Sequence, residues 1–332
     1  MSRRARLGLW IAAAALIVPA AHLALGRGVD WSALLAGTDA VSWRVLTELR
    51  LPRLVVALFA GTALGLAGLA LQSVLRNPLA APELTAVNPS AVLGYLIASG
   101  TGLIDGGSVF SSVLSATVGG LLGGGLLWLV AHRRTSEQTA VLGLLSALAL
   151  TGVVTILIAA RPTGVGGALR WLIGSVEARV AEHVPMIAIP VLVGFAALVL
   201  VADRLEILAV SDSHAHCLGV SPGFWRGVGI GIAVLLASAA VATVGPLAFV
   251  GFVAPHVVRL VFGGRLRRQV VLVAVCGGLF VAASDLIAKA VSLAIQLTGD
   301  GQQVGVPVGA VTCLIGAAAL VAVASSHQES EP

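Results

Sequence analysis

Residues Gly245–Arg259 read GPLAFVGFVAPHVVR, and this stretch points to the fold. It is apolar enough to lie in a membrane, yet it contains two prolines, Pro246 and Pro255, together with His256. Each proline removes a backbone donor and leaves carbonyl groups that need partners inside the protein. A plain lipid anchor has no use for such residues. The stretch therefore predicts a helix packed inside a membrane bundle.

The composition of the whole chain agrees with that prediction. Of the 332 residues, 58% are hydrophobic and 11% are charged, and the mean hydropathy is +1.02. A soluble globular domain is far less apolar. A spanning helix takes about 20 residues, so the length allows roughly ten spans joined by short loops. We expect an all-α, polytopic membrane protein that forms a single transmembrane domain over residues 1–332.

Charge and cysteine usage exclude several functional classes. The net charge is +5, but the arginines lie in short loops between apolar runs, where they set membrane topology. The only lysine, Lys289, follows Ala288 in an apolar run, so the chain has no Gly-Lys-Ser/Thr phosphate-binding loop. The three cysteines are widely spaced and indicate no disulfide. His214 and His216 do not share a helical face, so we predict no metal site.

The apolar runs predict a topology with both termini in the cytoplasm. Their spacing permits two halves of opposite orientation, so we expect inverted repeats. Residues 26–52 are predicted to form an external loop, and residues 203–224 the longest cytoplasmic polar stretch. The predicted spans are residues 7–25, 54–75, 91–103, 109–131, 139–160, 184–201, 225–244, the opening stretch, 270–293 and 308–324.

The second span carries several separate signals. Small residues that let neighbouring backbones approach closely lie at Gly61, Gly65 and Gly68. The span closes with Gln72 and then Asn77-Pro78, a turn signal that stops the helix. A helix stop explains the proline, but it explains neither Gln72 nor the nearby Glu83.

Charged residues mark the external side of the predicted bundle. Arg50 and Arg53 lie at the external end of the second span, where they either reach to the membrane interface or receive carboxylates of an external partner. Lys289 follows Asp285 by four residues, a favourable acid-before-base spacing on a helix. That pair either has a function or stabilises helix packing, and the sequence leaves both interpretations open.

The cytoplasmic stretch 205–219 reads LEILAVSDSHAHCLG and differs from its surroundings. Asp212 or Ser213 can cap a short helix, and Gly219 can end it. We therefore expect a compact rod on the cytoplasmic face.

Several motifs along the chain carry a family resemblance: Leu51-Pro52-Arg53, the RNPLAAP run within Gln72–Pro82, Trp171 with Gly174-Ser175, Leu218-Gly219, and GPLAFVGFVAPHVVR. Through them the chain, from Leu49 to about Val323, resembles the permease subunits of bacterial ABC importers for iron-siderophores, haem and cobalamin, the FecCD-like family. The resemblance implies about ten helices per subunit in the bacterial inner membrane and two permeases around a central pathway. It also implies an external solute-binding protein and two cytoplasmic ATPases that hold ATP and Mg²⁺.

The resemblance also implies roles by position. Arg50, Arg53 and Lys289 resemble the basic residues that dock the binding protein. A segment that sits in a cleft of the ATPase is matched by Asp212, Ser213, Ala215, Leu218 and Gly219. The remaining motif residues are expected to be structural: Gln72, Asn77, Pro78, Gly245, Pro246, Gly251, Pro255, His256, Arg259 and Asp285. The chain departs from the family pattern at Gly305 and Ala318.

We therefore expect a permease that moves an iron-siderophore-type chelate inward while a separate subunit hydrolyses ATP. The expected pathway includes parts of residues 139–160 and of the second span. A haem or cobalamin importer of the same family is the alternative, and the two permeases are either identical or different chains. A secondary transporter driven by ions would need paired acids near the membrane midplane, where only Asp285 qualifies. The chain is not expected to be an enzyme, because it contains neither Gly-x-Ser-x-Gly nor His-Glu-x-x-His. No cofactor is expected in this chain, since ATP and Mg²⁺ are expected on the partner ATPase.

Overall fold

The computed structural model describes residues 3–26, 28–37, 39–104, 108–131, 136–160, 173–298 and 305–328, and these ranges contain helices and no strand. The motif residue Trp171 lies outside them. The long helices are α1 (Arg3–Ala24), α4 (Leu51–Leu75), α5 (Val87–Gly100), α6 (Val109–Ala131), α7 (Ser136–Ala159), α9 (His183–Val210), α11 (Pro222–Val244), α12 (Val250–Val261), α13 (Leu266–Thr298) and α14 (Val308–Gln328). The short ones are α2 (Trp31–Leu35), α3 (Ala40–Arg44), the π-helix η1 (Val45–Arg50), the 3₁₀-helix η2 (Pro82–Leu84) and α10 (Asp212–Cys217).

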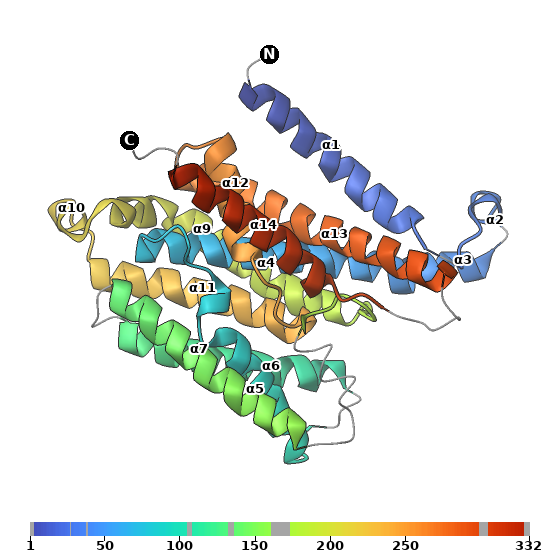
Figure 1. The fold of residues 1–332 in the computed structure, drawn as a ribbon, viewed down its shortest axis with the longest axis horizontal. Coiled ribbons are helices and arrows are strands. Elements are labelled where there is room, and N and C mark those ends of the chain that lie inside the picture. Colours follow the sequence, from blue (N-terminus) through green and yellow to red (C-terminus); the bar gives the residue numbers. More distant parts are fainter. Residues whose placement is uncertain are drawn as a thin grey trace.

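The helices form one elongated bundle. Most of the long helices run along its length, with α10 at one end and α2 and α3 at the other (Figure 1). We call these the α10 end and the α2–α3 end. Among the described residues, six helices are long and apolar enough to cross a membrane, and three more apolar helices are shorter. The prediction of an all-α, polytopic membrane protein is confirmed.

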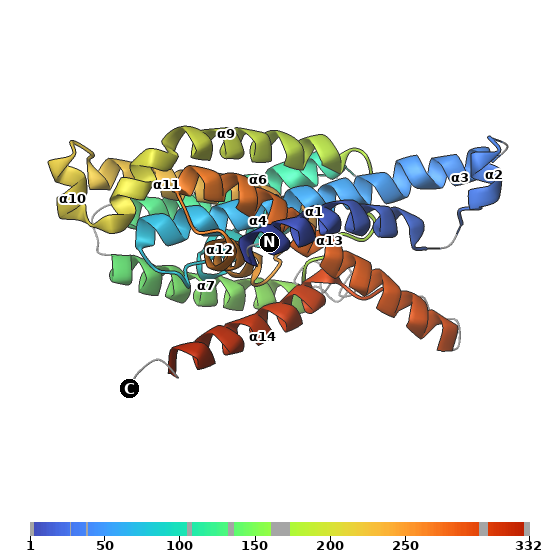
Figure 2. The same ribbon diagram turned by 90° about the horizontal axis from the view of Figure 1, so that it is seen from above.

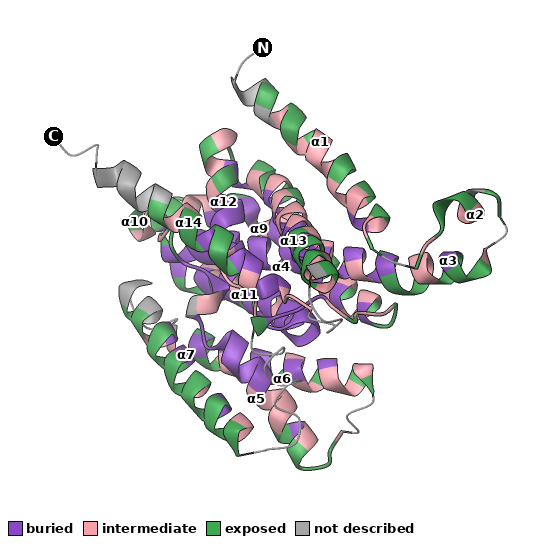
Figure 3. Ribbon diagram, turned by 45° about the vertical axis from the view of Figure 1, so that its right-hand side comes forward, coloured by how far each residue is buried: buried purple, intermediate pink, exposed green. Residues whose placement is uncertain are grey.

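Helices α4 and α11 form the centre of the bundle (Figure 3). In the most apolar window of each span, 78% of the residues are buried, against 17% in α7. Helix α4 packs against α13, α11, α9 and α12, while α14 contacts α13 and α12 at the edge of the bundle (Figure 2). Helix α7 is apolar but little buried, so its exposed apolar face is available to lipid or to another subunit.

The glycines of α4 allow backbones to touch, as the sequence predicts. A Cβ atom at Gly61 would lie 2.6 Å from the carbonyl carbon of Gly277 in α13. A Cβ atom at Gly68 would lie 2.6 Å from the Cα of Gly251 in α12. Only a residue without a side chain fits at such crossings. Two neighbouring helices are therefore fixed against α4 by backbone contact.

The predicted external loop 26–52 is wrong in part, because much of it is helical. Asp30 and Asp39 start α2 and α3, since their carboxylates accept backbone N–H groups in the first turn of each helix. The Ser32 hydroxyl, followed by backbone N–H groups, lowers the pKa of Asp30 from its ordinary value. Helix α3 then continues through η1 into α4 without a break. The span therefore begins before its predicted start at Leu54.

The short helix predicted within residues 205–219 is confirmed as α10, but its cap is not one of the two predicted residues. Ser211 has extended backbone angles, φ −166° and ψ 160°, and its hydroxyl accepts the N–H of His214 at 3.0 Å. Gly219 follows the helix with φ +71°, a conformation that favours glycine. Helix α9 continues to Val210 and α11 begins at Pro222, so the predicted 203–224 loop is shorter than expected.

Candidate functional site

A cluster of charged side chains joins three helices near the α2–α3 end. The carboxylate of Asp285 on α13 is 1% exposed, and its Oδ2 lies 2.7 Å from Nε2 of His22 on α1. Arg53 of α4 binds the same carboxylate in a bidentate manner, with N–O distances of 2.8 and 2.7 Å. Two parallel donors fix both distance and orientation. Asp285 therefore ties the end of α1 and the start of α4 to α13.

Arg50 and Lys289 both bind the end of α1. Lys289 donates from Nζ to the carbonyl oxygen of His22 at 3.0 Å. Arg50, only 6% exposed, donates to the carbonyl oxygens of Leu23 at 2.5 Å and Ala24 at 3.3 Å. Cations at the C-terminus of a helix satisfy its last carbonyls and its dipole. The predicted ion pair between Asp285 and Lys289 is thus replaced, because the forked guanidinium of Arg53 takes the carboxylate.

A polar cavity of about 190 Å³ adjoins this cluster. Its lining includes both cations, Arg53 and Lys289, and the carboxylate of Glu177. A Cβ atom at Gly305 would lie 2.6 Å from Oε1 of Glu177, so the glycine leaves room for that carboxylate. The departure from the family pattern at Gly305 therefore has a local physical reason. The cavity offers two cations and one anion to a polar group that enters it.

The stretch Gly245–Arg259 forms a turn and then α12. Gly245 ends α11 with φ +78°, and α12 begins after Phe249, whose φ is +64°. Gln72 of α4 donates to the carbonyl oxygen of Gly251 at 3.1 Å, and Arg259 donates to the Gln72 side-chain oxygen. One glutamine thus connects α4 to both the first and the last turn of α12. This position explains Gln72, which a simple helix stop does not.

Other residues of the motif pack the stretch in place. The carbonyl of Pro246 lies against Gly174, whose φ is +78°. Pro255 is buried inside α12. His256 stacks on the Phe252 ring, with centroids 5.5 Å apart and planes 22° apart. The structural role of His256 stays a prediction.

Glu83 of η2 lies at the start of α12. Both of its carboxyl oxygens are buried, and they face the backbone N–H groups of Phe249 and Gly251 without a close hydrogen-bond partner among the described residues. Burial raises the pKa of the Glu83 carboxyl to about 7, although the backbone N–H groups that it faces lower it. Glu83 therefore belongs to the contact between the RNPLAAP loop and α12, a role that the sequence does not reveal.

Asp212 anchors α10 to the bundle. Its Oδ1 lies 3.2 Å from a guanidinium nitrogen of Arg76 and 3.1 Å from one of Arg226. Arg76 is the C-cap of α4, and Arg226 lies in the first turn of α11. Within α10 the side chain of Ala215 is fully buried, whereas Leu218, directly after the helix, is 55% exposed. The short helix is thus bound to the ends of the two central helices.

The predicted turn after α4 is confirmed. Asn77 Oδ1 accepts the N–H of Leu79 at 2.9 Å, and the Asn77 carbonyl accepts the N–H of Ala80 at 3.0 Å. Pro78 follows Asn77 directly, and no helix continues through it. The turn directs the chain back into the bundle toward η2.

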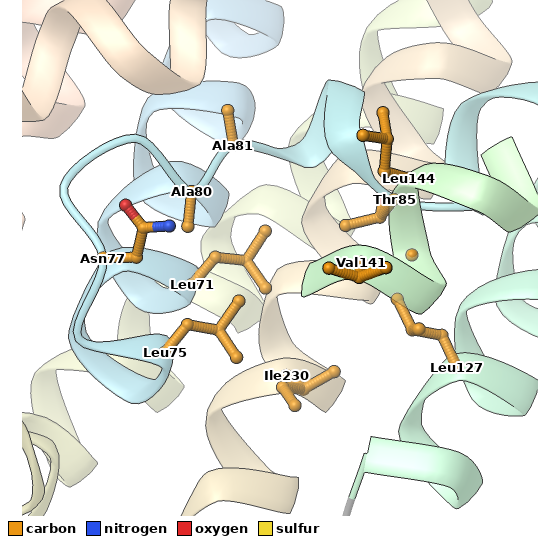
Figure 4. A pocket seen from close by; sticks show the side chains of 11 residues that line it. Leu71, Leu75, Asn77, Ala80, Ala81, Thr85, Leu127, Val141, Leu144 and Ile230 are labelled. Atoms are coloured by element: carbon orange, nitrogen blue, oxygen red, sulfur yellow. The ribbon is translucent and has the colours of Figure 1, made fainter. Parts of the chain in front are cut away.

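An apolar cavity of about 190 Å³ lies beside this turn (Figure 4). Leu71 and Leu75 of α4 face Val141 and Leu144 of α7 across it. Such a cavity has few polar partners for water. The two segments expected to contribute to a pathway thus meet here.

The ionisable residues of these clusters that are missing from the predicted site residues include His22, Arg226 and Glu177. His22 lies three residues before the end of the apolar run 7–25, and Arg226 is the second residue of the run 225–244, so both carry the signal of an ionisable group in a membrane segment. Glu177 carries no such signal, because its place beside Gly305 depends on tertiary packing.

A bundle of apolar helices with ion-pair clusters near both ends and an apolar cavity between its helices is typical of a polytopic membrane transport protein. Residues 9–326 match the model of the FecCD transport family, and the chain belongs to that family. It is 37% identical over 295 residues to the Fe(3+) dicitrate transport system permease protein FecD of Escherichia coli, covering 87% of this chain and 88% of that protein. It is 33% identical over 296 residues to the ferric enterobactin transport system permease protein FepG of the same organism, covering 88% and 85%.

A solved structure shows the same fold. A metal-chelate type ABC transporter in an inward-facing conformation superimposes with a TM-score of 0.83 at 23% sequence identity. The match covers 97% of this chain and 99% of that one. At this identity the likeness extends to the fold alone, and it agrees with the bundle described above.

Proposed function

We propose that this chain is the permease subunit of an ATP-driven importer that carries an iron-siderophore-type chelate across the bacterial inner membrane. The observation that carries the proposal is the 37% identity to a ferric dicitrate permease over 87% of the chain. In the assembled transporter a second permease subunit, two ATPases and an external solute-binding protein join this chain. ATP and Mg²⁺ belong to the ATPases, and both termini of the permease lie in the cytoplasm.

The position of Asp285 favours an ATP-driven importer over an ion-driven transporter. A secondary transporter uses intramembrane acids as ion sites. Asp285 is instead held by Arg53 and His22, with three contacts of 2.7–2.8 Å. A carboxylate bound in this way acts as a structural tie between helices, so it is a poor site for a mobile ion.

Arg53 and Lys289 are proposed to receive a carboxylate of the solute-binding protein, because both line the polar cavity near the α2–α3 end. Arg50 supports this site indirectly, because it is buried and holds the end of α1 in place through the Leu23 carbonyl oxygen. Lys289→Gln should weaken binding-protein affinity at least tenfold, and the exposed Arg44 provides the control Arg44→Gln at the same end of the bundle. Equal affinities of the wild type and Lys289→Gln would remove the docking site from this cavity.

Helix α10 is proposed to sit in a cleft of the ATPase. Ser213, Leu218 and Gly219 are exposed at the extremity of the bundle, and Ala215 fixes the helix from below. Through Asp212 the helix is bound to Arg76 and hence to the end of α4. A displacement of α10 by the ATPase would therefore act directly on a central helix.

The function is tested by transport in proteoliposomes. The permease is reconstituted with its ATPase and binding protein, and uptake of radiolabelled ferric dicitrate is measured with ATP inside or outside the vesicle. Uptake should require ATP on the α10 side and should be competed by other ferric siderophores more strongly than by haem or cobalamin. Uptake driven by an ion gradient without the ATPase would refute the proposal.

A further inference from the structure

We infer that a cavity around Arg259 at the α10 end is a socket for an acidic side chain of the ATPase subunit. This inference rests on the proposed function and adds a second contact beside α10. The cavity has a volume of about 370 Å³. Its lining comes from the end of α4 and the following turn, the last turns of α9 and α12, and the start of α13: Gln72, Arg76, Glu206, Arg259, Leu266 and Gln269 among others.

Arg259 carries a charge that the described residues do not compensate. Its guanidinium, which is only partly exposed, donates to the neutral side-chain oxygen of Gln72, and no ion pair in the described part of the chain involves it. Arg53, Arg76 and Arg226, by contrast, each bind a carboxylate. A partly buried cation is costly unless an anion accompanies it. Arg259 is therefore matched to an anion supplied from outside the chain.

The other charged groups that line the cavity, Glu206 and Arg76, already have partners. Glu206 is the acid among the lining residues, and its Oε2 accepts the N–H of Leu266 at 3.0 Å, at the start of α13. That contact places the carboxylate on the positive end of the α13 dipole. Of the two guanidinium groups in the lining, Arg76 already binds Asp212, so Arg259 is the one that the described residues leave without a carboxylate. Guanidinium forks suit a carboxylate, which they bind through two parallel hydrogen bonds.

The location of the cavity identifies the partner. Ala209 lines it from the last turn of α9, directly before α10, and Arg76 binds Asp212, the first residue of α10. The cavity is therefore continuous with the segment proposed to bind the ATPase. An acidic side chain that enters it would touch α4, α9, α12 and α13 at once. This gives a direct role to the last residue of the stretch Gly245–Arg259.

The first test measures ATPase affinity with the full-length permease in nanodiscs. Arg259→Gln should weaken ATPase binding at least tenfold and reduce its dependence on salt, because one charge pair is lost. Arg259→Lys should keep part of the affinity, since it keeps the charge but loses the fork. Gln72→Met removes the same internal hydrogen bond and leaves the charge, so it should lose less affinity than Arg259→Gln. Arg267→Gln, an exposed arginine of α13 that does not line the cavity, is the matched control.

The outcomes separate this inference from the proposed function. If the wild-type permease binds no ATPase, the proposed function fails. If the wild type and Arg259→Gln bind the ATPase equally, only the socket is refuted. Native mass spectrometry of the same samples shows whether an anionic lipid is bound to the cavity instead. If Arg259→Gln no longer binds that lipid but keeps its ATPase affinity, the inference is also overturned. If Arg259→Gln does not fold, a cross-linking experiment replaces it. The variant Gln269→Cys is tested for disulfide cross-links to cysteines introduced at acidic positions of the ATPase. Cross-links support the socket, and their absence refutes it.

Discussion

Replacing Gly68 with alanine should separate α4 from α12. A Cβ atom there would lie 2.6 Å from the Cα of Gly251, whereas non-bonded carbons prefer about 3.5–4.0 Å, so the helices must move apart by about 1 Å. Overpacking of this kind costs about 1–3 kcal/mol. The same movement stretches the 3.1 Å hydrogen bond from Gln72 to Gly251, and a buried bond left unmade costs about 1–3 kcal/mol. After the roughly 1 kcal/mol that alanine gains in a helix, the net loss is about 1–5 kcal/mol.

The loss is measured by SDS-induced unfolding of the purified protein in mixed micelles, followed by circular dichroism. The control is Gly231→Ala in α11, where nothing lies within 4 Å of the added Cβ, and it should be neutral or up to about 1 kcal/mol stabilising. Transport should fall for Gly68→Ala and remain for Gly231→Ala. A Gly68→Ala protein as stable as the control would show that the backbones of α4 and α12 do not touch.

Three further substitutions test the ion pairs and the end of α10. Asp285→Asn leaves the Arg53 guanidinium without its buried carboxylate and should lower the free energy of unfolding by about 3–5 kcal/mol in the same assay. Asp212→Asn removes both ion pairs of α10, so ATP hydrolysis measured in proteoliposomes should no longer respond to the binding protein while the fold persists. Gly219→Ala forces a side chain at φ +71°, which costs about 1–2 kcal/mol, and should reduce ATPase affinity without altering binding-protein affinity.

Much of the fold follows from apolar periodicity and from a few special residues. Each predicted span corresponds to a helix, because an apolar run in a membrane must pair its backbone groups internally. The glycines of α4 and the Asn77-Pro78 turn were also predictable, since each imposes a local backbone constraint. The external loop was not, because its capping residues Asp30 and Asp39 form short helices inside a polar stretch. Polarity alone does not distinguish a loop from a short capped helix.

The candidate site was predictable only as a set of residues. Arg53, Asp285 and Lys289 stand out as charges in apolar surroundings, yet their partners lie far away in sequence. The i,i+4 spacing favoured Lys289 as the partner of Asp285, but the helix packing brings Arg53 and His22 to that carboxylate. Pairing of this kind depends on helix register and rotation, which a single sequence does not define.

Helix α4 connects the two proposed binding surfaces. Arg53 in its first turn binds Asp285, and Arg76, the C-cap directly after its last residue, binds Asp212, so an ion pair to another element holds each end. Between these two ends, the close backbone crossings at Gly61 and Gly68 fix α13 and α12 against the same helix, so α4 cannot shift along its axis alone. A displacement imposed at α10 is therefore expected to reach the α2–α3 end. By linkage, whatever factor the ATPase applies to binding-protein affinity, the binding protein must apply to ATPase affinity, and Asp212→Asn should reduce both factors equally.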